Sequence, residues 1–336
     1  MPNLYLVPII SALFAFFTVF YITPWIMRFL KRIDMVDTDQ NKQEKPTIPI
    51  SGGLPVMIGL FVGLMIFIFI RTFFPEDNVG LILNEGSLVL FFASITSIFI
   101  ITFLGFMDDL LRKSNYGFPG LRQWQKPLLT LLAAVPLIVI NAGDTTIGLP
   151  LFGEVNLGLL FPLVLIPIGF VGATNMVNML AGYNGMETGM GIIYTGMLGL
   201  FAYVNGSYVA ALIGLLSFSS LIAFYYYNKY PADILPGDSL TYLLGAILAV
   251  MAIVGNIEKA ALIVSIPFFI EFILKSRSRF KAQSYGRYDN GKIKTNYSKI
   301  YSIPHIFTNK GRLTEKQIVY TMIMVELFFS SLIWII

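Results

Sequence analysis

Three short stretches of the sequence carry oxygen-bearing side chains between long apolar runs. The stretches and their candidate residues are GFMDDLL with Asp108 and Asp109, LPGDSLTY with Asp238, and NMLAGYNGMETG with Asn178, Asn184, Gly185 and Glu187. Carboxylate and amide oxygens are the ligands that Mg²⁺ prefers, and a carboxylate can also accept a proton from an attacking group. The three stretches therefore predict a metal or acid-base site, provided that the fold brings them together.

Each stretch also has a plainer interpretation. The acidic pair at 108–109 could be the charged end of a helix near water, and Asp238 could cap the helix that follows Pro236 and Gly237. Asparagines inside a membrane can hold helices together. However, a cap and a metal ligand are compatible roles, because a carboxylate has two oxygens, and the asparagines cluster with glycines at a predicted helix end. This clustering favours a site.

Basic residues near these stretches could bind phosphate. Lys126 opens the apolar run that follows the acidic pair, and Arg277 and Arg279 flank Ser278. A lysine offers phosphate a point charge, and an arginine can hold two phosphate oxygens at once. A basic run beside a membrane can equally bind anionic lipid headgroups. The single histidine, His305, is a weaker candidate for a role in binding substrate.

Composition places the chain in a membrane. Of its 336 residues, 56% are hydrophobic and only 12% are charged, whereas a soluble domain has about 25% charged residues. The chain has no cysteine and one histidine, which excludes disulfides, cysteine-based zinc or redox sites and multi-histidine metal sites. No Lys or Arg precedes the apolar run 4–20, so we expect a retained span and no signal peptide.

The positions of the apolar runs predict an all-α fold. Runs of about 20 apolar residues can cross a bilayer as helices. We expect a single domain, residues 1–336, that forms a polytopic bundle of about ten transmembrane helices, near 4–29, 52–73, 87–107, 126–141, 157–179, 187–203, 207–227, 239–255, 259–275 and 317–336. Glu326, inside the last span, is a candidate functional residue without an assigned role.

The basic residues orient this bundle. Counting Arg28, the alternate loops 30–51, 108–126, 180–187, 228–238 and 275–316 hold 21 of the 23 Lys and Arg residues. Cytoplasmic loops are enriched in these residues. We therefore expect these loops, including the long basic loop 275–316 and all the candidate residues, at the cytoplasmic face of a prokaryotic plasma membrane. Both termini then lie outside.

The order and spacing of the motifs resemble a known family. GFMDDLL, TNMVNMLAGYNGMETG, NKYPADILPGDSLTY and KPTIPISGG are similar to motifs of the polyprenyl-phosphate N-acetylhexosamine-1-phosphate transferases. NMLAGYNGME looks closest to the archaeal and eukaryotic UDP-N-acetylglucosamine:dolichyl-phosphate transferases. Bacterial members, including phospho-N-acetylmuramoyl-pentapeptide translocase, are more distant because they tend to have D-G-x-D-G there.

The resemblance implies a role for each candidate residue. Asn178 and Asp238 would ligate Mg²⁺, Lys126 and Arg277 would hold the phosphates, and Arg279 would lie near the sugar. Asn184, Gly185 and Glu187 would lie close to the nucleotide, and Asp108 and Asp109 would activate the lipid phosphate or support the metal site. The chain departs from the family in two ways, since Ser278 stands where animal members have histidine, and His305 stands alone where bacterial members have several histidines.

The implied reaction transfers N-acetylglucosamine 1-phosphate from UDP-GlcNAc to dolichyl phosphate in the bilayer, the first step of lipid-linked oligosaccharide assembly. Phosphate has a second pKa of about 6, so the lipid phosphate is already mostly dianionic at neutral pH and needs no strong base. We therefore rank a role of Asp108 in supporting the metal or positioning the substrate at least as highly as a role as base. The same chemistry on undecaprenyl phosphate or with another UDP-HexNAc stays open, and so does a homodimer. A secondary transporter is the alternative from another class, while no nucleic-acid partner is expected.

Overall fold

The computed structural model describes residues 6–74, 85–113, 120–122, 124–149 and 153–335. Helices dominate this part of the chain, and a membrane explains why, because a helix satisfies its own backbone hydrogen bonds in lipid. The helices are α1 Leu6–Arg32, α2 Gly53–Phe73, α3 Glu85–Lys113, α4 Gln125–Val139, α5 Ile166–Met179, α6 Met186–Val204, α7 Tyr208–Asn228, α8 Gly237–Gly255, α9 Glu258–Val264, α10 Ile266–Ser276, α11 Ile303–Thr308 and α12 Glu315–Ser331.

The predicted all-α membrane fold is confirmed. Among the described residues, seven helices are long and apolar enough to cross a membrane, and Gln125–Val139 is a shorter apolar helix. Each predicted span coincides with described helical residues. The count of ten crossings stays a prediction, because several of these helices are shorter or more polar than a typical span.

One predicted span, 259–275, is two helices. α9 ends at Val264 and α10 begins at Ile266, with Ser265 between them. Pro267 has no N–H to donate and its ring crowds the preceding turn, so the helix breaks there. The Ser265 hydroxyl donates to the Ala261 carbonyl at 2.6 Å and satisfies part of the interrupted backbone.

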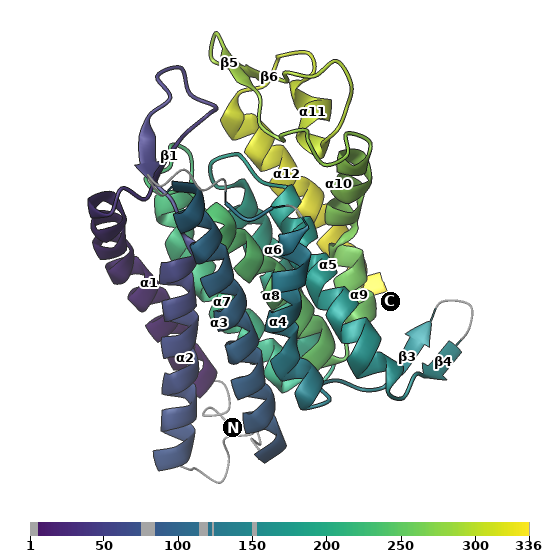
Figure 1. Ribbon diagram of the computed structural model, residues 1–336. Coiled ribbons are helices and arrows are strands. Elements are labelled where there is room, and N and C mark those ends of the chain that lie inside the picture. The colour runs from purple at the N-terminus through teal and green to yellow at the C-terminus, as the bar shows by residue number, and fades with distance from the viewer. Residues whose placement is uncertain (1–5, 75–84, 114–119, 123, 150–152, 336) are drawn as a thin grey trace.

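Helix α8 lies at the centre of the bundle (Figure 1). Every residue from Asp238 to Gly255 is buried, as expected of a helix that is apolar on all sides. Two glycines let neighbouring backbones approach its first turn. A Cβ on Gly53 of α2 would lie 2.4 Å from the Ser239 carbonyl oxygen, and one on Gly105 of α3 would lie 2.5 Å from that of Asp238.

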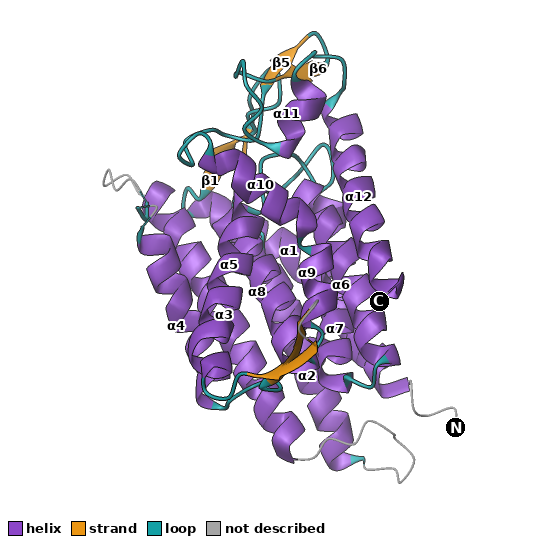
Figure 2. Ribbon diagram, turned by 90° about the vertical axis from the view of Figure 1, so that its right-hand side faces the viewer, coloured by secondary structure: helices purple, strands orange, loops and turns teal. Residues whose placement is uncertain are grey.

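The segments between helices gather into two groups (Figures 1 and 2). One end of the bundle carries α11 and the antiparallel pairs β1 (Val36–Thr38) with β2 (Thr47–Pro49) and β5 (Arg287–Asp289) with β6 (Lys292–Lys294). We call this the basic end, since the sequence 275–316 lies here. The hairpin of β3 (Thr146–Leu149) and β4 (Gly153–Asn156) lies at the opposite end.

Candidate active site

Four charged side chains meet at the basic end, where α3, α4 and α8 come together. Lys126 Nζ lies 2.7 Å from Asp108 Oδ2 and 2.6 Å from Asp238 Oδ2. Arg112 Nη2 lies 3.1 Å and 2.9 Å from the same two oxygens. The other Asp108 oxygen accepts the Leu121 backbone N–H at 2.6 Å. Asp108, Lys126 and Asp238 therefore lie together, and Arg112 joins them.

The second member of the acidic pair, Asp109, faces a different group. Its carboxylate accepts the backbone N–H groups of Asp238 at 2.9 Å and Ser239 at 3.3 Å, and the Ser51 hydroxyl at 2.8 Å. These N–H groups belong to the first turn of α8, where donors have no partner within the helix. Asp109 thus caps α8 from another helix. The interpretation of Asp238 as the cap of its own helix is wrong, because Pro236 occupies that position and Asp238 lies inside the first turn.

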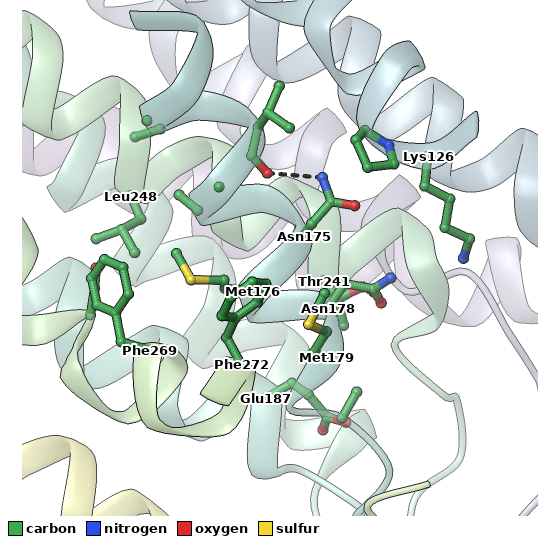
Figure 3. Close-up of a pocket in the computed structure, with 18 of the residues that line it drawn as sticks. Lys126, Asn175, Met176, Asn178, Met179, Glu187, Thr241, Leu248, Phe269 and Phe272 are labelled. Carbon is green, nitrogen blue, oxygen red and sulfur yellow. Dashed lines mark hydrogen bonds between the residues drawn. The ribbon is translucent and has the colours of Figure 1, made fainter. Parts of the chain in front are cut away.

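The charged cluster opens into a cavity of about 1690 Å³. Its polar end contains Arg112, Lys126, Asn178, Glu187 and Asp238. Mostly apolar side chains line the rest, together with Glu258, Lys259 and Lys275. The apolar ones come from the π-helical turn Phe161–Leu165 and from α5, α8, α9 and α10; they include Phe161, Ile166, Leu248, Ala252, Leu262, Phe269 and Phe272. Figure 3 shows Lys126, Asn178 and Thr241 on one side of this space and Leu248 and Phe269 on another.

Asn178 and Glu187 line the polar end of the cavity. The Thr241 hydroxyl, one turn after Asp238, donates to Asn178 Oδ1 at 2.8 Å and so ties α5 to α8. Glu187 Oε1 accepts the Gly182 backbone N–H at 2.6 Å. Its buried second oxygen, Oε2, has no hydrogen-bond partner in the described part of the chain. Glu187 therefore keeps one acceptor for a donor group that enters the cavity.

The neighbouring residues Asn184 and Gly185 do not reach the cavity lining. Asn184 Nδ2 donates to Asp39 Oδ2 at 2.8 Å, and its backbone N–H donates to Glu315 Oε1 at 3.0 Å. Lys42 forms ion pairs with the same two carboxylates. Gly185 takes a φ of 86°, which suits glycine, directly before α6. Both residues shape the turn that carries Glu187 and Gly182.

Arg277, Arg279 and His305 also lie outside the cavity lining. Both arginines are exposed, and Arg277 donates to the Ile300 carbonyl at 3.2 Å. His305 is buried, with Nε2 2.9 Å from the Gln283 carbonyl and Nδ1 accepting the Tyr301 N–H at 3.3 Å. His305 therefore connects the two ends of the segment 283–305 by hydrogen bonds. The roles predicted for these residues in substrate binding stay predictions, and the cavity borders this segment through Ala282, Gln283, Ser284 and Tyr285.

The sequence reading missed Arg112, Ser51 and Thr241. A signal existed for Arg112, since residues four apart on a helix are neighbours and it follows Asp108 by four. Thr241 follows Asp238 by three and faces the same way for the same reason. No local sequence pattern indicates a role for Ser51, because its partner Asp109 is 58 residues away in the chain.

The donor set at the polar end suits Mg²⁺. Asp108, Asp238 and Asn178 offer hard oxygen ligands on three adjacent helices, and Mg²⁺ is commonly held by one or two carboxylates together with substrate phosphates. No group of three or more His, Asp or Glu side chains within the described ranges forms a complete metal cage. The residues present therefore fit a metal that shares its coordination with a phosphate ligand.

Comparison with known proteins identifies the family. Residues 90–256 match glycosyl transferase family 4. A Saccharolobus solfataricus protein, provisionally named UDP-N-acetylglucosamine–dolichyl-phosphate N-acetylglucosaminephosphotransferase, is 35% identical over 96% of this chain and 94% of its own length. The Dictyostelium discoideum protein of that name is 27% identical over 89% and 81%, and a Clostridium botulinum phospho-N-acetylmuramoyl-pentapeptide-transferase is 29% identical over 65% and 62%.

The chain therefore belongs to glycosyl transferase family 4. The predicted family resemblance and the enzyme class, a glycosyl-1-phosphate transferase, are confirmed. Together with its apolar helices, this makes the protein an integral-membrane transferase.

Proposed function

We propose that the protein transfers N-acetylglucosamine 1-phosphate from UDP-GlcNAc to dolichyl phosphate or a related polyprenyl phosphate. The products are GlcNAc-diphospho-polyprenol and UMP. The observation that carries the proposal is a cavity that joins the charged cluster at one end to a long and mostly apolar lining. The names of the relatives from S. solfataricus and D. discoideum support the choice of both substrates.

In the proposed reaction one diphosphate linkage replaces another. An oxygen of the lipid phosphate forms a bond to the β-phosphorus of UDP-GlcNAc. The bond from that phosphorus to the oxygen bridging it to the α-phosphorus breaks, and UMP leaves with the electron pair. The lipid phosphate is already mostly dianionic at neutral pH. The protein therefore needs chiefly to bring two anions together and to offset their charge.

The residues of the polar end would have different roles in this reaction. Lys126 and Arg112 supply positive charge to the phosphates. Asp238, supported by Asn178 and Asp108, would hold Mg²⁺, which when bound withdraws charge from the diphosphate oxygens. Asp109 fixes the first turn of α8 and with it the position of Asp238. The unpaired oxygen of Glu187 is a candidate acceptor for a hydroxyl or N–H of the nucleotide sugar.

The apolar part of the cavity fits the lipid tail. Its lining comes from α5, α8, α9 and α10, and the apolar side chains there would exclude water from around a polyprenyl chain. We further propose that the basic end faces the cytoplasm, where nucleotide sugars are made available. The charge asymmetry of the loops supports this orientation.

A direct assay tests the proposed function. Purified protein is incubated with labelled UDP-GlcNAc and dolichyl phosphate, with and without Mg²⁺, and the lipid is extracted. We expect Mg²⁺-dependent label in the organic phase. If label enters the lipid only with undecaprenyl phosphate, the proposed acceptor is wrong. If it enters only from another UDP-HexNAc, the proposed donor is wrong. No label with any of these pairs would overturn the function.

A matched pair of variants connects the activity to the cluster. We expect Asp238→Asn to lower transfer about 100-fold or more, because it weakens the metal and cation contacts. Asp233→Asn changes an exposed carboxylate in the loop before α8 and should leave transfer unchanged. Full activity of the Asp238→Asn protein would remove this site from the reaction.

A further inference from the structure

Arg112 occupies an unusual place for a phosphate-binding residue. Its Nη2 contacts the Oδ2 atoms of Asp108 and Asp238 at 3.1 and 2.9 Å, the same two oxygens that Lys126 holds. Its side chain is also the most accessible of the four, with 39% exposed compared with 18% for Lys126 and 1% for Asp108. The guanidinium therefore contacts the carboxylates while its side chain stays accessible from the cavity that it lines.

The charges of the cluster limit what can be added to it. Asp108, Asp109 and Asp238 carry at most three negative charges when all are ionised, and Lys126 and Arg112 offset two of them. A free divalent cation at Asp238 would lie close to both cations and leave the cluster with a net positive charge. A divalent cation that arrives with a diphosphate brings the compensating anion, and the same phosphates offer Arg112 a bidentate partner.

We propose that Arg112 holds the place of the divalent cation on Asp238 until the nucleotide sugar enters, and then moves from Asp238 to the diphosphate. The metal consequently binds together with the nucleotide and only weakly before it. This inference rests on the proposed function, since it takes the diphosphate of a UDP-sugar as the partner of Arg112.

Binding of Mn²⁺ to the detergent-solubilised full-length protein tests the proposal. Mn²⁺ replaces Mg²⁺ because free and bound Mn²⁺ differ in their electron paramagnetic resonance signals. Titrations are made with and without UDP-GlcNAc and with no lipid acceptor, so that no turnover occurs. For the wild type we expect about a tenfold or greater tightening of Mn²⁺ by UDP-GlcNAc, within the usual range of coupling between two ligands.

The variant Arg112→Gln removes the competing cation. We expect it to bind Mn²⁺ alone about tenfold more tightly than the wild type and to lose most of the tightening by UDP-GlcNAc. Arg122→Gln is the matched control, because Arg122 is an exposed arginine of the neighbouring segment and should leave both affinities unchanged. Thermal unfolding of each variant confirms that the compared proteins are folded.

Three outcomes would overturn the proposal. The first is that the wild type binds Mn²⁺ equally well with and without UDP-GlcNAc. The second is that Arg112→Gln and the wild type bind Mn²⁺ alone equally well. The third is that Arg112→Gln binds Mn²⁺ more weakly, which would mean that Arg112 supports the metal site. Failure of the proposed function is recognised separately, by the absence of labelled lipid in the transfer assay. Tighter Mn²⁺ binding by Arg112→Gln can still be observed if the transfer assay gives no product.

Discussion

At the scale of single residues, Asp108 and Asp109 show how neighbours in sequence take different roles. Successive residues on a helix point about 100° apart, so Asp108 reaches Lys126 and Arg112 while Asp109 reaches the first turn of α8. A sequence pattern records that two carboxylates are adjacent but not which neighbouring helix each one meets. The pair was therefore predicted as one unit, and the structure divides it into a site residue and a cap.

His305 gives a prediction of pH dependence. Burial holds the pKa of His305 below its ordinary value and nearby Lys275 lowers it further, whereas the hydrogen bond to the Gln283 carbonyl raises it. The unfolded chain thus binds the proton more readily than the folded chain does. The stability that neutral His305 contributes is fully present above its unfolded pKa of about 6.5 and is lost as pH falls through the lower folded pKa.

A comparison with His305→Gln measures this effect. Glutamine can donate and accept without titrating, so groups elsewhere affect both proteins equally. We expect the thermal stability of the wild type relative to His305→Gln to be greatest near pH 8 and to shrink toward pH 5. A difference that is constant over this range, or that grows at low pH, would contradict the assigned protonation state.

Lys42 gives a second prediction at this scale. It pairs with Asp39 and Glu315, whose side chains are only 4% and 3% exposed. Lys42→Met keeps the aliphatic stem but leaves two buried carboxylates without their cation, a loss of about 3–5 kcal/mol in comparable sites. Thermal unfolding should show this loss, and Lys310→Met, at an exposed lysine, should not. If Glu315→Gln does not partly rescue Lys42→Met, the ion pair is not the cause.

At the scale of elements, the close approach of α3 to α8 gives a third prediction. Alanine at position 105 should favour the helix by about 1 kcal/mol on propensity alone, but its Cβ would lie 2.5 Å from the Asp238 carbonyl oxygen. We expect Gly105→Ala to shift the first turn of α8 and lower kcat about 100-fold, the cost of a displacement of about 1 Å at a reacting centre. Gly199→Ala, whose Cβ would meet the Gly214 backbone at 3.4 Å, is the control. Unchanged kcat in Gly105→Ala would show that α8 tolerates the shift.

The elements also show what the sequence could predict. Apolar runs of about 20 residues fixed the positions of the helices, because a span must match the bilayer. Lys126, Asn178, Glu187 and Asp238 line one cavity, and Asp108 contacts Lys126. The partners of Asn184 were not predictable, since Asp39 lies 145 residues and Glu315 131 residues away. Such contacts depend on how helices pack, which no local pattern encodes.

At the scale of the whole molecule, the distribution of basic loops gives a prediction of orientation. The chain has no cysteine, so single substitutions report their own position. Ser298→Cys lies on the exposed basic end, and Asn205→Cys lies in the exposed turn between α6 and α7. In intact cells, a membrane-impermeant maleimide should label Asn205→Cys and should label Ser298→Cys only after the membrane is opened. The reverse pattern would put the active site outside.

The extent of the cavity gives the last prediction, which separates the two substrates. Ala252 lines its apolar part and lies 14 residues after Asp238 on α8, so the two are separated by about 21 Å at 1.5 Å per residue. Trp at this position would fill space that only a long lipid tail needs. We therefore expect Ala252→Trp to raise the KM for a long polyprenyl phosphate about tenfold and to leave the KM for UDP-GlcNAc unchanged.

The acceptor itself supplies the control for that prediction. A polyprenyl phosphate with a tail shorter than about 21 Å does not reach position 252, so the wild type and Ala252→Trp should use it equally well. Leu262→Trp, at an exposed residue of the same lining, repeats the test with less risk to folding. Equal loss with short and long acceptors would mean that the variants disturb the polar end. No loss with either would mean that the lipid lies elsewhere, because a tail inside this cavity must pass the substituted side chains.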